Sequence, residues 1–290
     1  MIIIGCSKGV HVAANIAKFA KKKYSELQVN KFPDGETDLR FKCDVRKKVV
    51  VLVQSFYGDI NDALMEVFLA AHTAKDLGAK RVVLMAPYFP YFRQDTRFHP
   101  GECVSLPILG KFVDACLSEI YVMDPHLHRE KNLKHVFRIR GHKLTANGLV
   151  RDYIKKHIKN PIIIGPDWES YKWARATAEM IGCESAILKK TRYSSRHVEV
   201  ALDHDVDLSK HNVVIVDDII STGHTLLETI KLLRKDLGAK KITCIGIHGV
   251  FAEHALSKLK KAKVSVVTTN TIPNAAAMID VAREFAERIR

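Results

Sequence analysis

The chain alternates short runs of consecutive apolar residues with longer amphipathic segments. Runs of four or five apolar residues lie at 49–53, 120–123 and 213–216. A continuous apolar run of this length is typical of a parallel strand that is buried on both faces. The segment from about Leu226 onward has the three- and four-residue apolar spacing of a helix. The pattern therefore predicts alternating strands and helices, which form mostly parallel, twisted sheets with helices on both faces.

A repeated hexapeptide predicts that two related halves make up the chain. The string Lys-Asp-Leu-Gly-Ala-Lys occurs at 75–80 and again at 235–240. Each copy follows a predicted helix and precedes a predicted strand, at 81–85 and at 241–245. The shared order favours a duplicated α/β domain. Chance recurrence of a helix-ending sequence is the alternative.

The boundary between the two halves is expected near residue 143. Segment 125–141 is rich in Arg, Lys and His and has little apolar periodicity, as in a linker or a ligand-binding loop. The expected domains are therefore 1–142 and 143–290. In open parallel sheets, ligands gather at the carboxyl ends of the strands, so polar residues that follow strands are the candidates for function.

Composition and charge narrow the class of protein. The chain has 290 residues, 47% of them hydrophobic and 27% charged, and a formal net charge of +14. The lysines are scattered along helices without interleaved aromatic residues, which argues against nucleic-acid binding and fits attraction of polyphosphate substrates. No apolar run approaches the ~20 residues that span a bilayer. The six cysteines have no Cys-x-x-Cys spacing and predict buried thiols in a reducing cytoplasm.

Residues 213–225 carry the most specific chemistry. Asp217 and Asp218 follow the apolar run, and the small-residue loop 221–225 precedes the predicted helix. Backbone N–H groups and the positive end of a helix suit a phosphate. Paired carboxylates suit the vicinal hydroxyls of a sugar, because each oxygen can accept a hydrogen bond. The string predicts a ribose 5-phosphate site, with an ordinary strand-to-helix turn as the alternative.

The first half lacks this chemistry at the corresponding place. Gln54 and Ser55 stand where the second half has Asp217 and Asp218, and the following loop differs in length. We therefore expect the first half to have kept the scaffold and lost the sugar-phosphate site.

Other polar segments near predicted strands are further candidates. Residues 32–36, Phe-Pro-Asp-Gly-Glu, form a strong turn signal, and Phe32 could also stack on a base. Segment 86–105 combines five aromatic residues with arginines whose planar forks match phosphate oxygens. In 124–128, Asp-Pro-His-Leu-His, the histidines could contact a metal or a phosphate. Each segment could instead be a structural or solvated loop.

Two more segments lie in the second half. Asp167 follows an apolar run and could hold sugar hydroxyls or hydrated Mg²⁺, or be a solvated turn carboxylate. Segment 188–196 is polar and basic. It could be a hairpin with a solvated cationic tip, or a mobile arm that brings Lys190 and Arg192 over a transferring phosphoryl group.

Taken in order, these motifs resemble the ribose-phosphate pyrophosphokinase family, also called phosphoribosyl-pyrophosphate synthetases, and look most like its archaeal branch. The similarity runs from about residue 5 to 273. It implies two related doubly wound parallel-sheet domains of the type I phosphoribosyltransferase fold. It also implies transfer of the β,γ-pyrophosphoryl group of MgATP to the anomeric hydroxyl of ribose 5-phosphate. The nucleobase phosphoribosyltransferases share only the 213–225 string, and a non-catalytic regulatory homologue is the other alternative.

The resemblance also implies roles for individual residues, carried over by position. The implied ATP-binding residues are Phe32, Asp34, Glu36, Arg93, Gln94 and Asp95. The implied ribose 5-phosphate-binding residues are Asp217, Asp218, Ser221, Thr222, Gly223, His224 and Thr225. The implied Mg²⁺ contacts are His126 and Asp167, and the implied catalytic pair is Lys190 and Arg192. The family completes its adenine pocket across a subunit interface, which implies a homo-oligomer.

Two departures from the family pattern concern the sugar site. Trp168, Glu169 and Ser170 follow Gly-Pro-Asp where small residues are usual, and His224 stands where Gly or a small residue is usual. The first places a bulky side chain beside the expected sugar site, and the second adds an imidazole to the expected phosphate loop.

Overall fold

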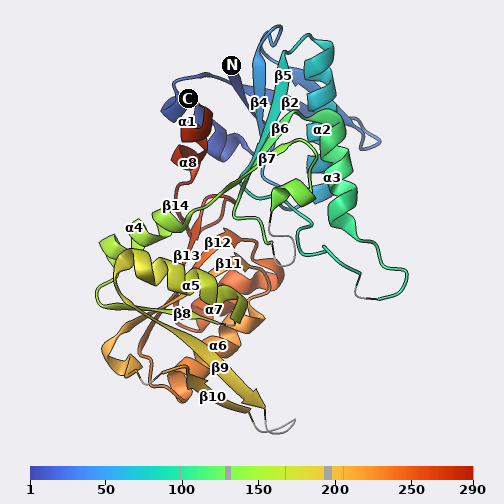
Figure 1. Cartoon of the computed structure of the whole chain (residues 1–290). Coiled ribbons are helices and arrows are strands. Elements are labelled where there is room, and N and C mark those ends of the chain that lie inside the picture. The colour runs from blue at the N-terminus through green and yellow to red at the C-terminus, as the bar shows by residue number, and fades with distance from the viewer. Residues whose placement is uncertain (98, 128–131, 167, 193–197, 205, 290) are drawn as a thin grey trace. The chain divides into compact units, whose positions relative to one another are not determined.

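The structure is a computed structural model that describes residues 1–97, 99–127, 132–166, 168–192, 198–204 and 206–289. The chain forms two compact units (Figure 1). Unit 1 comprises Met1–Thr145 and Asp280–Arg290, and unit 2 comprises Ala146–Ile279. The α/β class with two mostly parallel sheets is confirmed. The division falls slightly after the expected residue 143, and the C-terminal segment joins the first unit instead of the second.

Unit 1 contains a seven-stranded sheet with the order β3-β2-β1-β4-β5-β6-β7. All neighbouring strands are parallel except β2 and β3, which form an antiparallel hairpin at one edge. The strands are β1 (Ile2–Gly5), β2 (Lys23–Lys31), β3 (Thr37–Phe41), β4 (Val49–Val53), β5 (Arg81–Ala86), β6 (Glu119–Met123) and β7 (Arg140–Leu144). The helices are α1 (Val10–Ala20), α2 (Ile60–Asp76), α3 (Ser105–Cys116), η1 (Leu133–His135), α8 (Ala282–Ala286) and η4 (Glu287–Ile289).

Unit 2 has a sheet with the order β10-β9-β8-β11-β12-β13-β14, again with one antiparallel hairpin, β9–β10, at the edge. The strands are β8 (Pro161–Gly165), β9 (Glu184–Arg192), β10 (Val198–Leu202), β11 (Asn212–Ile220), β12 (Lys241–Gly249), β13 (Ser265–Thr269) and β14 (Ala277–Ile279). The helices are α4 (Asn147–His157), α5 (Trp168–Ile181), η2 (Leu208–Lys210), α6 (His224–Lys235), η3 (Ala252–His254) and α7 (Ala255–Lys261).

The two sheets have the same strand order, which supports the predicted duplication. Each copy of the hexapeptide ends the helix that connects the fourth and fifth strands of its unit, α2 to β5 and α6 to β12. The central glycine of each copy has a positive φ, 83° at Gly78 and 68° at Gly238. Glycine adopts this conformation without steric cost, so it can turn the chain out of the helix into the next strand.

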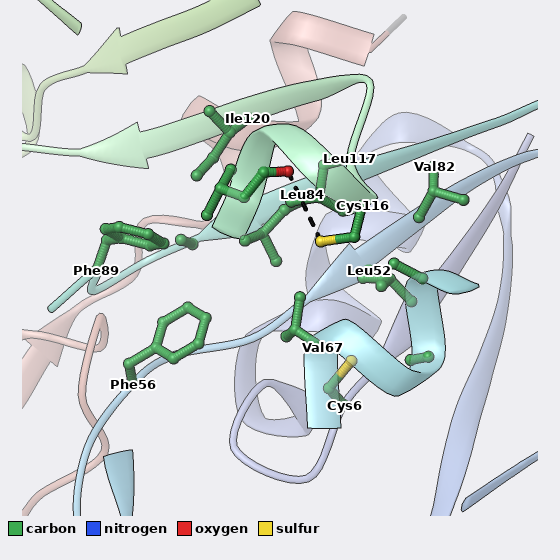
Figure 2. Close-up of a cluster of buried hydrophobic side chains, with 14 of the residues drawn as sticks. Cys6, Leu52, Phe56, Val67, Val82, Leu84, Phe89, Cys116, Leu117 and Ile120 are labelled. Carbon is green, nitrogen blue, oxygen red and sulfur yellow. Dashed lines mark hydrogen bonds between the residues drawn. The ribbon is translucent and has the colours of Figure 1, made fainter. Parts of the chain in front are cut away.

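Apolar side chains cover both faces of each sheet. Consecutive strand residues such as Ile3 and Ile4 are fully buried, as expected for strands that have helices on both sides. In unit 1, the face formed by Leu52 and Leu84 packs against α2 and α3. Figure 2 shows this cluster with Phe56 and Phe89, whose rings meet edge to face at 5.3 Å. The other face packs against α1, and α8 packs against α1 in turn.

The helix that follows the last strand of each sheet packs in the other unit. Helix α4 follows β7 but belongs to unit 2, where it contacts α5. Helix α8 follows β14 and contacts α1, the first helix of unit 1. In α8, Phe285 is fully buried. Burial of this apolar side chain explains why the C-terminal segment groups with unit 1.

Candidate active site

The two carboxylates of the 213–225 string lie inside a strand and not after it. Strand β11 continues through Asp217 and Asp218 to Ile220, pairing with β12 as far as Ile220–Gly249. On its other side, the last paired residue is Ile215, opposite Ile164 of β8. The sequence pattern ended the strand too early, because two charged residues interrupt its apolar run. The carboxylates therefore lie on an extension that is paired along one edge only.

The alternation of the strand places the two carboxylates on opposite faces of the sheet. Asp217 shares its face with Val213 and Ile215, which pack in the core under α6. Burial raises the pKa of the Cys244 thiol in this core to about 12, and the negative charge of Asp217 adds to the rise. Asp218 lies on the opposite face, and both side chains are half-buried. The two groups lie near the strand end but on opposite faces, so they do not form a one-sided clamp.

The loop that follows is shorter than the sequence suggested. It comprises Ser221, Thr222 and Gly223, and α6 begins at His224, so His224 and Thr225 lie in the first helical turn. Gly223 has φ 74° and ψ 6°, a left-handed conformation that favours glycine. The first N–H groups of a helix have no partner within it, and no side chain caps this end. Loop and helix thus present backbone donors at the carboxyl edge of the sheet, as a phosphate site requires.

His224 contacts a strained segment that follows β12. Its Nε2 lies 3.9 Å from Oε2 of Glu253, which also lies 3.5 Å from Nζ of Lys258. Glu253 and His254 have positive φ values of 52° and 60°. Both partners of the histidine contact are more than half exposed, so the pair contributes little to stability. The contact gives His224 a neighbour without defining a catalytic role.

The equivalent edge of unit 1 is filled by its own side chains. Gln54 and Ser55, directly after β4, are fully buried. The buried carboxylate of Glu66 on α2 accepts hydrogen bonds from the Ser7 N–H at 2.8 Å, from the Ser7 hydroxyl, and from Nε2 of Gln54 at 3.2 Å. Oε1 of Gln54 accepts from the Lys8 N–H at 2.9 Å. An internal anion therefore uses donors at this edge, which agrees with the expected loss of the sugar-phosphate site.

Glu66 was not among the sequence candidates. The signal that could have revealed it is a single charge inside the apolar run Leu64 to Phe68 of a predicted helix. Such a charge is buried only when it has partners, and those partners are distant in sequence.

Phe32, Asp34 and Glu36 lie together at the tip of the β2–β3 hairpin. The turn is closed by hydrogen bonds from the Phe32 N–H to the Glu36 carbonyl at 2.9 Å and from the Gly35 N–H to the Phe32 carbonyl at 2.9 Å. The side chain of Phe32 is 52% exposed. The ring of Phe32 and the two carboxylates are all exposed at this edge hairpin, where another molecule can contact them.

The loop between β5 and α3 is anchored by aromatic side chains and leaves its polar residues nearer the surface. Phe89 and Phe92 are buried in the core, whereas Arg93 is exposed. Oε1 of Gln94 accepts a hydrogen bond from the Ser105 hydroxyl at 3.0 Å, which ties this residue to the start of α3. Asp95, next along the loop, is half-buried. The aromatic residues are thus structural, and the guanidinium of Arg93 is accessible.

His126 follows β6 and is half-buried, at the carboxyl edge of the unit 1 sheet. Asp167, the other predicted metal contact, lies outside the described residues. Within the described residues, no group of three or more His, Cys, Asp or Glu side chains could hold a metal ion.

The basic segment forms the predicted hairpin. Lys190 and Arg192 lie in β9, paired with Val200 and Val198 of β10 at the antiparallel edge of unit 2. Residues 193–197, which connect the two strands, lie outside the described residues. Trp168 begins α5. The hairpin fits both alternatives left open by the sequence, a cationic tip or an arm over the substrate.

Comparison with known proteins supports the resemblance that the motifs indicated. Residues 1–117 match the family model of the N-terminal domain of ribose phosphate pyrophosphokinase, and residues 134–286 match the phosphoribosyl transferase domain. The ribose-phosphate pyrophosphokinase of Methanothermobacter thermautotrophicus is 35% identical over 99% of both chains. The chain belongs to the ribose-phosphate pyrophosphokinase family. The enzyme of the same name from Pyrococcus furiosus is 34% identical over 98% of this chain and 99% of its own.

A solved structure gives the same result for the fold of this family member. The phosphoribosylpyrophosphate synthetase from Mycobacterium smegmatis superimposes with a TM-score of 0.86, at 25% identity, over 100% of this chain and 97% of its own. The family and the fold predicted from the motifs are therefore confirmed. The roles of individual residues remain predictions. No helix among the described residues is long and apolar enough to cross a membrane.

Proposed function

We propose that the protein transfers the β,γ-pyrophosphoryl group of ATP to the anomeric hydroxyl of ribose 5-phosphate, which gives phosphoribosyl pyrophosphate and AMP. Full-length membership of the pyrophosphokinase family supports the reaction class. The observation that carries the proposal is the carboxyl end of β11, where two half-buried carboxylates precede a glycine loop and the open start of α6.

Unit 2 would bind ribose 5-phosphate at this strand end. The N–H groups of the loop 221–223 and of His224 and Thr225 would donate to the 5-phosphate, helped by the positive end of α6. Asp217 and Asp218 would accept hydrogen bonds from the ribose hydroxyls. Their placement on opposite faces of the sheet means that each would hold a different hydroxyl.

Unit 1 would bind the nucleotide. The exposed guanidinium of Arg93 suits the phosphates, and Gln94 is held in place by Ser105. The exposed hairpin tip with Phe32, Asp34 and Glu36 suits adenine by stacking and hydrogen bonding. Because the tip projects at a sheet edge, we propose that it contributes to the adenine pocket of a second copy in a homo-oligomer.

Magnesium would enter with ATP, with His126 and Asp167 as its protein contacts. The described residues offer no all-protein cage, which fits a cation that keeps several waters and is held by one or two protein groups plus substrate phosphates. When bound, the ion would neutralise charge on the β- and γ-phosphates.

Lys190 and Arg192 would stabilise the charge that develops during transfer. Phosphoryl transfer depends on positioning and charge neutralisation more than on covalent chemistry, and two cations on one strand supply both. The anomeric oxygen would attack the β-phosphorus in line, the bond to the AMP oxygen would break, and no covalent enzyme intermediate would form.

The test is AMP release from MgATP measured with and without ribose 5-phosphate. The proposal predicts release that depends on ribose 5-phosphate and needs no nucleobase. A nucleobase phosphoribosyltransferase would instead release pyrophosphate from phosphoribosyl pyrophosphate only when a base is present. Absence of AMP formation from a folded protein that binds both substrates would indicate a regulatory homologue and contradict the proposal.

A further inference from the structure

An open groove of about 430 Å³ lies between α6 and the end of α7 in unit 2 (Figure 1). Residues at positions i, i+3, i+4, i+7 and i+8 of α6 form one side of the groove, and a residue at the end of α7 forms the other. This spacing places the α6 residues on one face of the helix. The lining is Leu227, Ile230, Lys231, Arg234, Lys235 and Ala262.

The groove is aliphatic toward the start of α6 and cationic toward its end. Ile230 is buried in the core of unit 2, and the half-buried Leu227 packs against the same core. Lys231 and Lys235 are exposed one and two turns further along the helix. The groove therefore offers an apolar surface with cations on its rim.

Arg234 holds the two sides of the groove together. Its guanidinium donates a hydrogen bond to the carbonyl oxygen of Ala262, which caps the end of α7, and another to that of Lys263 at 2.8 Å. The last carbonyls of a helix have no partner within it, so a basic side chain commonly binds them. Because one side chain fixes both sides, the groove is preorganised, which lowers the entropic cost of binding a partner.

The surroundings of the groove are strongly positive. Helix α6 contains one acidic residue, Glu228, and α7 contains none. Among the described residues, neither Lys231 nor Lys235 has a carboxylate within ion-pair distance, and the same holds for the exposed lysines at the end of α7. Those lysines are Lys260, Lys261 and Lys263. The cations around the groove are thus available to an acidic partner.

The chemistry of the groove distinguishes between possible occupants. The chain has a net charge of +14, so a second copy would bring further cations to this surface. Nucleic-acid bases stack on aromatic side chains, and the lining has none. A membrane surface takes up apolar side chains that project, whereas here they line a recess. A protein segment that carries carboxylates around apolar side chains complements both parts of the groove.

We propose that this groove docks an acidic amphipathic helix of a partner protein. Large apolar side chains of that helix would lie over Leu227 and Ile230, with its carboxylates beside Lys231 and Lys235. Recognition of a helix in a groove uses apolar anchors at such a spacing, and the volume lies within the range of about 300–1,000 Å³ typical of ligand pockets. The proposal is independent of the reaction proposed above.

The test is fluorescence anisotropy of a labelled peptide of about 16 residues, long enough to form a helix in isolation. The peptide consists of Glu, Ala and Leu, with the leucines at three- and four-residue spacing and the glutamates beside them. One control peptide has alanine in place of the leucines, and a second has lysine in place of the glutamates. The full-length protein should bind the first peptide with a Kd of about 1–100 µM and each control at least about tenfold more weakly.

Variants of the protein test the location of binding. Lys231→Ala combined with Lys235→Ala should weaken binding of the acidic peptide about tenfold and reduce its salt dependence. Leu227→Gln should weaken it by a similar factor, because the groove loses an apolar contact. The matched control combines Lys155→Ala with Lys156→Ala, which removes two exposed lysines of α4 in the same unit and should leave binding unchanged. Thermal unfolding of each variant establishes that it is folded.

Several results would overturn the proposal. These are no saturable binding at about 1 mM peptide, equal weakening by the α4 variant, and full affinity for the peptide without leucines. An oligouridylate that displaces the peptide and depends equally on Lys231 and Lys235 would assign the surface to nucleic acid. A change in the sedimentation coefficient of the protein alone on replacement of these lysines would assign the surface to self-association.

Discussion

Replacing Gly223 by alanine tests the phosphate loop most directly. The residue has φ 74°, a conformation that costs an L-residue roughly 1–2 kcal/mol. An added Cβ would also lie 3.3 Å from Cβ of Ala255, a contact tight enough that one of the two must shift slightly. We expect the free energy of unfolding to fall by about 1–2 kcal/mol. The loop should also shift, so that at least one N–H no longer reaches the 5-phosphate.

A lost hydrogen bond to a charged group weakens binding about 10- to 100-fold, so the KM for ribose 5-phosphate should rise by that factor. The matched control is Gly238→Ala. Gly238 has φ 68°, and an added Cβ would have no atom within 4 Å, so this variant has similar backbone strain away from the site. The assays are urea unfolding and AMP release against ribose 5-phosphate concentration. A normal KM in Gly223→Ala, or the same rise in both variants, would refute the assignment of the loop.

Four further predictions concern other parts of the molecule. Lys190→Ala should lower turnover by orders of magnitude with nearly unchanged ATP binding, and normal turnover would remove this lysine from the mechanism. Phe32→Ala should raise the KM for ATP about tenfold without loss of stability, because the ring is 52% exposed. The control Ile108→Ala removes a side chain that is 57% exposed and should change neither the KM nor the stability. Glu66→Gln should lower the free energy of unfolding by about 1–3 kcal/mol in urea, because buried donors lose a charged acceptor; unchanged stability would contradict the role of this carboxylate. The pKa of Asp207 is lowered to about 2, chiefly by a hydrogen bond from the hydroxyl of Ser209. The stabilisation from this carboxylate is therefore complete above its ordinary pKa and is lost as pH falls through 2. Asp207→Ala should flatten the acid-unfolding curve in that range.

The candidate residues differ in how far the structure defines them. The hairpin tip, residues 93–95 of the loop after β5 and the strand end at Asp217 are described. Each has the exposure or the backbone donors that its predicted role requires. Asp167 lies outside the described residues, and the side chains of Lys190 and Arg192 are not described. For these three residues the predicted roles depend on the motif alone.

The sequence by itself determined the fold class, the duplication and the family. Continuous short apolar runs are typical of strands covered on both faces, and the hexapeptide marks the same helix end in both units. It also placed a glycine loop directly before a helix, because a glycine before a helix start is a local signal. Tertiary structure alone decided the features that depend on partners distant in sequence. It extended β11 through two charged residues by pairing them with β12, buried Glu66 against Ser7, and joined α8 to unit 1. Local patterns report what a segment prefers, whereas burial of a charge or the end of a strand depends on which other segment lies beside it.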